Sequence, residues 1–200
     1  SKILHEEALK YQSARAAFSA LLENMPKVDR IWMPAYICES MLAPIKSSSK
    51  ESCFYNIDEK FNIISNIYLK ENDLLLYVNY FGVCESVIHR ILDKFNPKQI
   101  IIDCSQAFFS RPYQCLATIY SPRKFFGIPD GGLIFTSQKI QPPNLQDTDS
   151  VFRMEHLITR LAISAEAGYA SYKAAEASLD NHTPKIMSRL TSKLLKSIDY

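Results

Sequence analysis

Residues 73 to 80 read Asp-Leu-Leu-Leu-Tyr-Val-Asn-Tyr, and this run constrains the fold more than any other part of the sequence. Its apolar residues follow one another without polar alternation, which is typical of a strand buried on both faces. Strands of that kind belong to parallel sheets that helices cover on either side. Gly82 breaks the run. The sequence therefore predicts a central strand of an α/β sheet at this place.

Short apolar runs alternate with helical patterns along the rest of the chain. Further strands are predicted at residues 31–33, 53–57, 99–102, 116–120 and 133–136. Helices are predicted at residues 6–24, 38–45, 85–95, 151–178 and 184–198. This alternation favours a three-layer α/β sandwich with a mostly parallel central sheet. In such a sheet, functional side chains gather at the carboxyl ends of the strands.

The composition fits one packed domain and gives no sign of a nucleic-acid or membrane partner. The 200 residues are 47% hydrophobic and 12% aromatic, as expected for a globular core. The net charge is +2, and no cluster of Lys and Arg forms a track for a phosphate backbone. No apolar stretch approaches the roughly 20 residues of a membrane span, and the N-terminus lacks a signal-peptide pattern. We therefore expect a cytoplasmic protein.

The cysteines and histidines give no pattern for a metal site or a disulfide framework. The five cysteines lie at positions 38, 53, 84, 104 and 115, without a close pair. The four histidines, at positions 5, 89, 156 and 182, are also isolated from one another. Metal sites need ligands at characteristic close spacings. We expect no bound metal.

A lysine in a tight turn is the most informative candidate for chemistry. Lys124 lies in the segment 121–132, between two apolar runs that are both predicted strands. Burying a lysine without a partner is costly, and a Schiff base with an aldehyde removes that cost. Asp103 ends another predicted strand, and Gln106 follows three residues later. A lysine and an aspartate at the ends of neighbouring strands are the pair that a pyridoxal phosphate site requires.

Each of these residues also has a purely structural alternative. Lys124 can be a surface lysine in a turn, and Asp103 can cap the turn that follows its strand. Ser13 can be a simple N-cap, and Arg15 can form a surface ion pair. Tyr36 can belong to the core or the rim of a pocket. These alternatives stay open at the level of sequence.

The motifs together resemble one known family. The chain resembles the large domain of fold-type I pyridoxal-phosphate (PLP) enzymes, and within them the DegT/DnrJ/StrS group of sugar aminotransferases. The resemblance runs from about residue 13 to residue 195. It is carried by residues 13–17 (Ser-Ala-Arg-Ala-Ala), 33–36 (Met-Pro-Ala-Tyr), 79–82 (Asn-Tyr-Phe-Gly), 103–106 (Asp-Cys-Ser-Gln) and 124–132.

The resemblance implies roles for three of these residues. In such enzymes a lysine at the position of Lys124 forms a Schiff base with the cofactor and later moves a proton. An aspartate at the position of Asp103 pairs with the protonated pyridine nitrogen, which keeps the ring an electron sink. A glutamine at the position of Gln106 packs near the cofactor ring.

The resemblance also implies a phosphate site, and here the sequence departs from the family. The phosphate is expected at the turn that opens the first helix, at Ser13, Ala14 and Arg15, with Ser121 or Tyr120 as a further contact. The family usually has a glycine and then a threonine or serine where this chain has Ala14 and Arg15. The ring-stacking aromatic is replaced by Cys38, so stacking is expected to pass to Tyr36 or to be absent.

The expected function follows from the resemblance. We expect an aminotransferase that moves an amine from an amino-acid donor to a keto sugar on a nucleotide, in a homodimer. Residues 1–200 are expected to be the PLP-binding large domain with a helical tail from about residue 151, and the usual small C-terminal domain is expected to be missing. Two alternatives remain, a PLP-dependent lyase or dehydratase and a non-catalytic relative.

Overall fold

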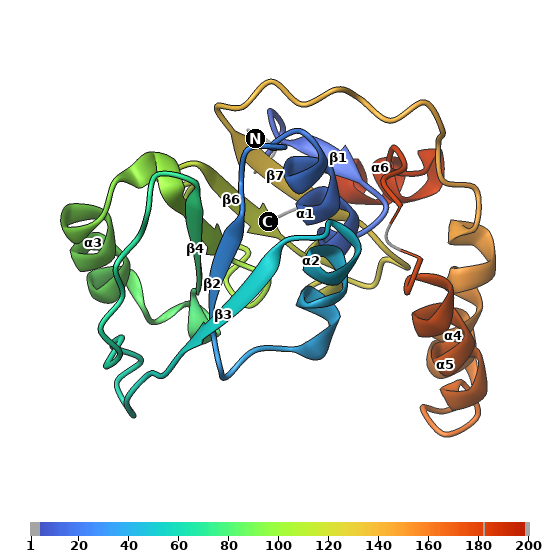
Figure 1. The fold of residues 1–200 in the computed structure, drawn as a ribbon. Coiled ribbons are helices and arrows are strands. Elements are labelled where there is room, and N and C mark those ends of the chain that lie inside the picture. Colours follow the sequence, from blue (N-terminus) through green and yellow to red (C-terminus); the bar gives the residue numbers. More distant parts are fainter. Residues whose placement is uncertain (1–4, 182, 199–200) are drawn as a thin grey trace.

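A seven-stranded sheet forms the centre of the protein (Figure 1). The computed structural model describes residues 5–181 and 183–198. The strand order is β1-β7-β6-β5-β4-β2-β3. The strands are β1 (Leu9–Tyr11), β2 (Arg30–Pro34), β3 (Glu51–Tyr55), β4 (Asp73–Val78), β5 (Ile100–Asp103), β6 (Ala117–Tyr120) and β7 (Gly132–Thr136). Strands β2 to β6 run parallel, whereas β7 is antiparallel to β6 and β1 is antiparallel to β7.

Strand β4 lies near the middle of this sheet, as its apolar run predicts. Every residue of β4 is buried, and the strand pairs in parallel with β2 on one side and β5 on the other. Strand β5 is likewise buried along its length. A strand with neighbours on both edges and helices on both faces has no exposed surface, so an unbroken apolar sequence fits it.

Helices cover both faces of the sheet. Helix α3 (Glu85–Lys94) lies on one side, and α1 (Ala14–Glu23) and α2 (Ala43–Ser47) lie on the other (Figure 1). In the described part of the chain, four short 3₁₀ helices lie between the main elements, η1 (Glu39–Met41), η2 (Tyr80–Gly82), η3 (Pro97–Gln99) and η4 (Pro122–Lys124). The three-layer sandwich with a mostly parallel sheet is thus confirmed.

The predicted helix over residues 6–24 is wrong in its first part. Residues 9–11 instead form β1, and α1 begins only at Ala14. The side chain of Ser13 accepts a hydrogen bond from the N–H of Ala16 and so marks the start of the helix. Strand β1 pairs with β7, which lies far away in the sequence. Pairing at the sheet edge therefore overrides a helical spacing that local pattern alone suggests.

The predicted helix over residues 151–178 is divided into two helices. They are α4 (Ser150–Ala162) and α5 (Tyr169–Ser178), which pack on each other beside the sheet (Figure 1). The chain turns just before Gly168, where an added Cβ would lie 2.9 Å from the carbonyl oxygen of His156. Only a glycine lets the two backbones approach so closely. The last helix, α6 (Arg189–Ser197), also begins later than the predicted residue 184.

A buried polar cluster fastens these helices to the turn before β7. The Arg153 guanidinium on α4 forms ion pairs with Asp130, at 2.8 Å, and with Asp147, at 2.7 Å. Thr191 of α6 and Ser150 of α4 donate hydrogen bonds to the Asp130 carboxylate. All five side chains are buried. Because buried charges need partners, this cluster fixes where α4 and α6 attach to the sheet.

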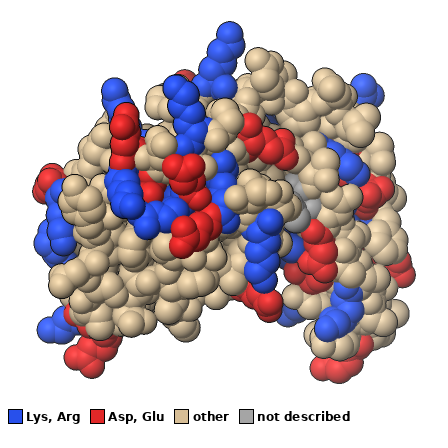
Figure 2. All heavy atoms as spheres, in the orientation of Figure 1, with Lys and Arg blue, Asp and Glu red and all other residues tan. Residues whose placement is uncertain are grey.

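The surface carries charges of both signs. Figure 2 shows Lys and Arg side chains interspersed with Asp and Glu, with no broad area of a single sign on the face drawn. Among the residues that the structure describes, no helix has the length and apolar character needed to cross a membrane.

Candidate functional site

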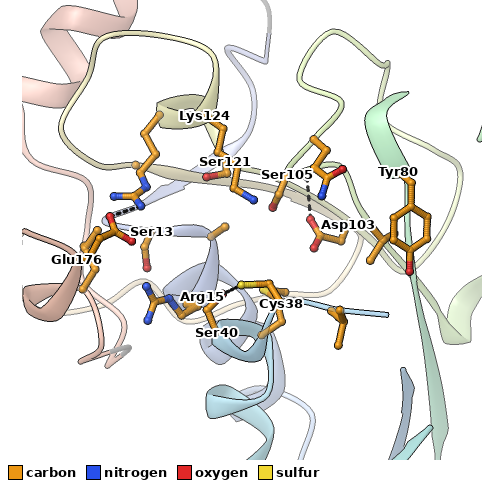
Figure 3. A pocket seen from close by; sticks show the side chains of 18 of the residues that line it. Ser13, Arg15, Cys38, Ser40, Tyr80, Asp103, Ser105, Ser121, Lys124 and Glu176 are labelled. Carbon is orange, nitrogen blue, oxygen red and sulfur yellow. Dashed lines mark hydrogen bonds and ion pairs between the residues drawn. The ribbon is translucent and has the colours of Figure 1, made fainter. Parts of the chain in front are cut away.

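One cavity brings together the eight candidate site residues that the sequence indicates. Its volume is about 410 Å³, and it opens where β4, β5 and β6 end and α1 begins (Figure 3). The predicted residues that line it are Ser13, Ala14, Arg15, Tyr36, Asp103, Gln106, Ser121 and Lys124. Residues far apart in the sequence meet here because the carboxyl ends of parallel strands share one edge of the sheet.

Lys124 enters the cavity from the turn after β6. It is the last residue of η4, and Figure 3 shows its side chain pointing into the cavity beside Ser121. Ser121 itself is buried, at the end of β6. Within the described part of the chain, no carboxylate forms an ion pair with Lys124. The amine of Lys124 is thus accessible to solvent and has no acidic side chain as an ion-pair partner among the described residues.

Asp103 enters the same cavity from the end of β5. Its side chain is only 4% exposed, and one carboxylate oxygen accepts a hydrogen bond from the N–H of Ser105 at 2.8 Å. No described Lys, Arg or His forms an ion pair with it. Burial raises the pKa of the neighbouring Tyr80, and the negative charge of Asp103 adds to this effect. A buried carboxylate without a cation is costly unless a ligand supplies the positive charge.

The side chain of Gln106 is tied to the loop after β4. Its amide oxygen accepts a hydrogen bond from the N–H of Phe81 at 3.1 Å. Phe81 has a φ of 53°, an uncommon conformation for a bulky residue. Gln106 therefore lines the cavity while fixing η2 against the loop that follows Asp103.

The N-terminus of α1 faces the cavity and leaves a backbone donor free. Ser13 accepts hydrogen bonds from Ala16 N–H through its side chain and from Ala17 N–H through its carbonyl. The N-cap interpretation of Ser13 is thus correct. For the N–H of Arg15, no acceptor is found among the described residues. The free N–H groups and the helix dipole together favour an anion at this end.

Two arginines lie at this end of the cavity, and sequence reasoning missed one of them. Arg15 pairs with Asp180, with 2.7 Å between Nη1 and Oδ1, so its predicted ion pair exists. Arg123, directly before Lys124, pairs with Glu176 of α5 and also lines the cavity. Its position directly before Lys124 in the sequence could have indicated that Arg123 also lies at the site. The contribution of Glu176 had no signal, because nothing in the sequence shows where α5 packs.

Tyr36 lies at the rim. Its side chain is 63% exposed, and its ring stacks on that of Tyr80 with 5.6 Å between centroids. The Tyr80 hydroxyl donates a hydrogen bond to the Tyr36 carbonyl at 2.7 Å. Cys38 also lines the cavity and accepts a hydrogen bond from the Ser40 hydroxyl. Tyr36 is thus an aromatic held at the mouth by Tyr80.

Metal ligands do not gather in this cavity. Among residues 5–181 and 183–198, no group of three or more His, Cys, Asp or Glu side chains is placed to hold a metal ion. The chemistry that the described side chains offer is an amine, a buried carboxylate, hydroxyl groups and guanidinium groups.

Comparison with solved structures identifies the class of fold. The chain is similar to the aminotransferase PseC from Helicobacter pylori, with a TM-score of 0.52 and 19% identity over 85% of this chain and 54% of that one. It is similar to the aminotransferase TlmJ from Streptoalloteichus hindustanus, with a TM-score of 0.53 and 13% identity over 66% and 41%. NtdA from Bacillus subtilis, with bound cofactor PMP, gives a TM-score of 0.52 and 17% identity over 66% and 33%.

At 13–19% sequence identity, the similarity to these three proteins is a similarity of fold. The chain therefore has the fold of the large domain of fold-type I PLP-dependent transferases, as the sequence resemblance implied. It spans about half the length of PseC and less of the other two. No protein-family model matches the sequence, and a search of curated proteins also finds no match.

Proposed function

We propose that this chain is the PLP-binding large domain of an aminotransferase. One observation carries the proposal. The unpaired amine of Lys124 and the buried carboxylate of Asp103, which lacks a cation, line the same cavity as the N-terminus of α1. The fold that it shares with the aminotransferases PseC and TlmJ, and with NtdA solved with bound cofactor PMP, supports this assignment.

The residues present fit pyridoxal phosphate. Its ring nitrogen is a base that a buried carboxylate keeps protonated, and Asp103 offers that carboxylate. Its phosphate is an anion, and the N-terminus of α1 with Arg15 offers N–H donors and positive charge. A volume of about 410 Å³ lies in the usual range for small-molecule sites. Tyr36 and Gln106 would border the ring, and Ser121 would give a hydroxyl near the phosphate.

When bound, pyridoxal phosphate supplies an aldehyde for covalent attachment and an electron sink for charge left on a substrate carbon. The Lys124 amine is the nucleophile that would hold it, and once neutral the same Nζ can take and return a proton. Asp103 would hold the protonated ring nitrogen, whose positive charge makes the ring electron-poor.

The substrate class is the finer part of the proposal. We propose a keto sugar, carried on a nucleotide, as amine acceptor and an amino acid as donor. Support comes from PseC, an aminotransferase involved in the biosynthesis of pseudoaminic acid. The competing candidates are a PLP-dependent lyase or dehydratase and a non-catalytic relative. Formation of pyridoxamine phosphate with loss of amine from glutamate would favour the transferase over all of these.

We also propose a cytoplasmic homodimer. Helices α4 and α5 and the loop between them expose several large apolar side chains, namely Val151, Phe152, Ile158, Leu161, Ile163, Tyr169 and Tyr172. Exposed apolar groups gathered on one helical pair are typical of an interaction surface. Light scattering coupled to gel filtration measures the mass in solution, and a monomer at all concentrations would contradict the dimer.

The cofactor proposal is tested by visible absorption. Purified protein is mixed with pyridoxal phosphate, and the same titration is run on Lys124→Ala. We expect a yellow band in the parent chain that is lost in Lys124→Ala. Lys139→Ala, which changes an exposed lysine outside the cavity, is the matched control and should keep the band. A folded parent chain without a band would contradict the proposal.

A further inference from the structure

Two arginines at one end of the cavity are each held by a carboxylate from the α5 region. Arg15 Nη1 lies 2.7 Å from Asp180 Oδ1, and Arg123 Nη2 donates to Glu176 Oε1. Glu176 belongs to α5, and Asp180 follows it closely in the sequence. Arg15, Arg123 and Glu176 all line the cavity. Figure 3 shows Ser13, Arg15 and Glu176 at one end of the cavity, with Tyr80 at the other.

These pairs use little of the binding capacity of the two arginines. A guanidinium has five N–H donors in a planar fork, and each pair shown here engages one terminal nitrogen. The Asp180 side chain is 75% exposed and the Glu176 side chain 30% exposed. Ion pairs of this kind contribute only about 0–1 kcal/mol, because water screens them. A doubly charged anion that bridges both guanidinium groups would form stronger, charge-assisted hydrogen bonds.

Helix α5 buries little of its own surface. Within α5 only Ala175 is buried, and Leu179 follows as its C-cap. Its other main contact is with α4. The two ion pairs therefore join the α5 region directly to the cavity, whereas packing and the hydrogen bond from Arg153 Nε to Ser178 Oγ hold α5 to α4.

We propose that Arg15 and Arg123 together bind a phosphate monoester dianion, and that Glu176 and Asp180 occupy these arginines until the anion displaces them. The anion and α5 then compete for the same two guanidinium groups. This inference rests on the proposed function, because the cofactor carries such a phosphate. It adds Arg123 as a phosphate-binding group. It also means that binding of the anion weakens the attachment of α5 to the two arginines. A phosphate on a substrate has the same chemistry.

The test measures the affinity of the full chain for inorganic phosphate by titration calorimetry. Arg123→Met removes one guanidinium and should weaken phosphate binding by about tenfold. Glu176→Gln removes the competing charge while keeping the shape, and should tighten binding by about two- to fivefold. Arg160→Met changes an exposed arginine of α4 outside the cavity and should leave the affinity unchanged. Circular dichroism checks that each variant is folded.

Hydrogen exchange gives a second readout. Phosphate should increase exchange over residues 169–180, although ligands usually reduce exchange near their sites. Unchanged or weaker phosphate affinity in Glu176→Gln, or protection of residues 169–180 by phosphate, would overturn the competition. Equal affinity in Arg123→Met and the parent chain would overturn the role of Arg123.

The source of the phosphate is resolved by competition. If pyridoxal phosphate displaces inorganic phosphate and pyridoxal does not, the site takes the cofactor phosphate. If inorganic phosphate and pyridoxal phosphate bind together, the site takes a phosphate of the substrate. The variant effects on inorganic phosphate are independent of the yellow band, so a failed cofactor proposal and a failed phosphate site give different results.

Discussion

The backbone of Gly132 lies directly against the peptide bond that joins Ser13 to Ala14. A Cβ added to Gly132 would be 2.1 Å from the carbonyl carbon of Ser13 and 2.3 Å from the nitrogen of Ala14. Next to it, Gly131 N–H donates a hydrogen bond to the carbonyl of Gln12 at 2.8 Å. The start of β7 thus supports the turn that opens α1, and this contact places the candidate phosphate site beside the turn of Lys124.

This contact predicts the effect of an added methyl group. Gly132→Ala should destabilise the protein by about 1–3 kcal/mol or more, because the backbone of Ser13 has to move. It should also weaken binding of pyridoxal phosphate, since the N-terminus of α1 moves with Ser13. Chemical denaturation and absorption titration measure the two effects. At Gly127 an added Cβ meets no atom within 4 Å, so Gly127→Ala is the control and should change stability little. Equal stability of the two variants would contradict the close contact.

The buried cluster around Arg153 predicts that loss of this guanidinium strongly destabilises the protein. Arg153→Met leaves the carboxylates of Asp130 and Asp147 buried without a cation, and should cost about 3–5 kcal/mol. Urea denaturation measures the free energy of unfolding. Arg160→Met, an exposed change on the same helix, should stay within about 0.5 kcal/mol of the parent chain. A small effect in Arg153→Met would mean that α4 is not anchored by these ion pairs.

His5 predicts part of the dependence of stability on pH. Burial lowers the pKa of His5 below its ordinary value of 6.5, despite a hydrogen bond to the carbonyl of Phe108. The unfolded chain therefore takes up a proton more readily, so stability is present above pH 6.5 and falls as the pH drops below it. His5→Phe should show a smaller drop in Tm between pH 7.5 and pH 5.5 than the parent chain. Burial lowers the pKa of His156 as well, so part of the drop should remain.

The control for this comparison is His89→Phe. His89 is exposed, and water screens its ion pair with Glu85 on the surface of α3, so its replacement should change the drop in Tm little. The same drop in His5→Phe as in His89→Phe would show that His5 does not become harder to protonate on folding.

Replacement of Asp103 should affect cofactor affinity and protein stability in different ways. Asp103→Asn keeps the oxygen that accepts from Ser105 N–H but removes the buried charge, so the free energy of unfolding should stay equal or rise. Affinity for pyridoxal phosphate should fall by about tenfold or more, because a charge-assisted hydrogen bond contributes about 1.5–3 kcal/mol. Asp93→Asn, an exposed change on α3, should alter neither quantity. A destabilised Asp103→Asn with unchanged affinity would favour the alternative that Asp103 only caps its turn.

Local pattern determined much of the fold and the identity of the candidate residues. The apolar run at residues 73–80 indicated a strand buried on both faces, and β4 is such a strand. Runs that end in Asp103 and precede Lys124 indicated which side chains lie at strand ends, and both line one cavity. These inferences work because burial and strand ends leave signals within a few residues of the chain.

Tertiary packing decided which strands pair, how the helices pack and which charged side chains face one another. Residues 9–11 form a strand because β7 offers an edge. Helix α5 packs back on α4 in a place where only a glycine, Gly168, lets the chain pass so close to the carbonyl of His156. The partners of Arg123 and Arg153 are also distant in the sequence, since Glu176 belongs to α5 and Asp130 to the turn before β7. A residue's own neighbours fix its backbone preference, whereas the charge that faces it and the strand that pairs with it depend on long-range contacts. The sequence thus determined the layers of the fold and the amine and carboxylate of the site. Only the tertiary structure decided which carboxylates of the α5 region face the two arginines at its other end.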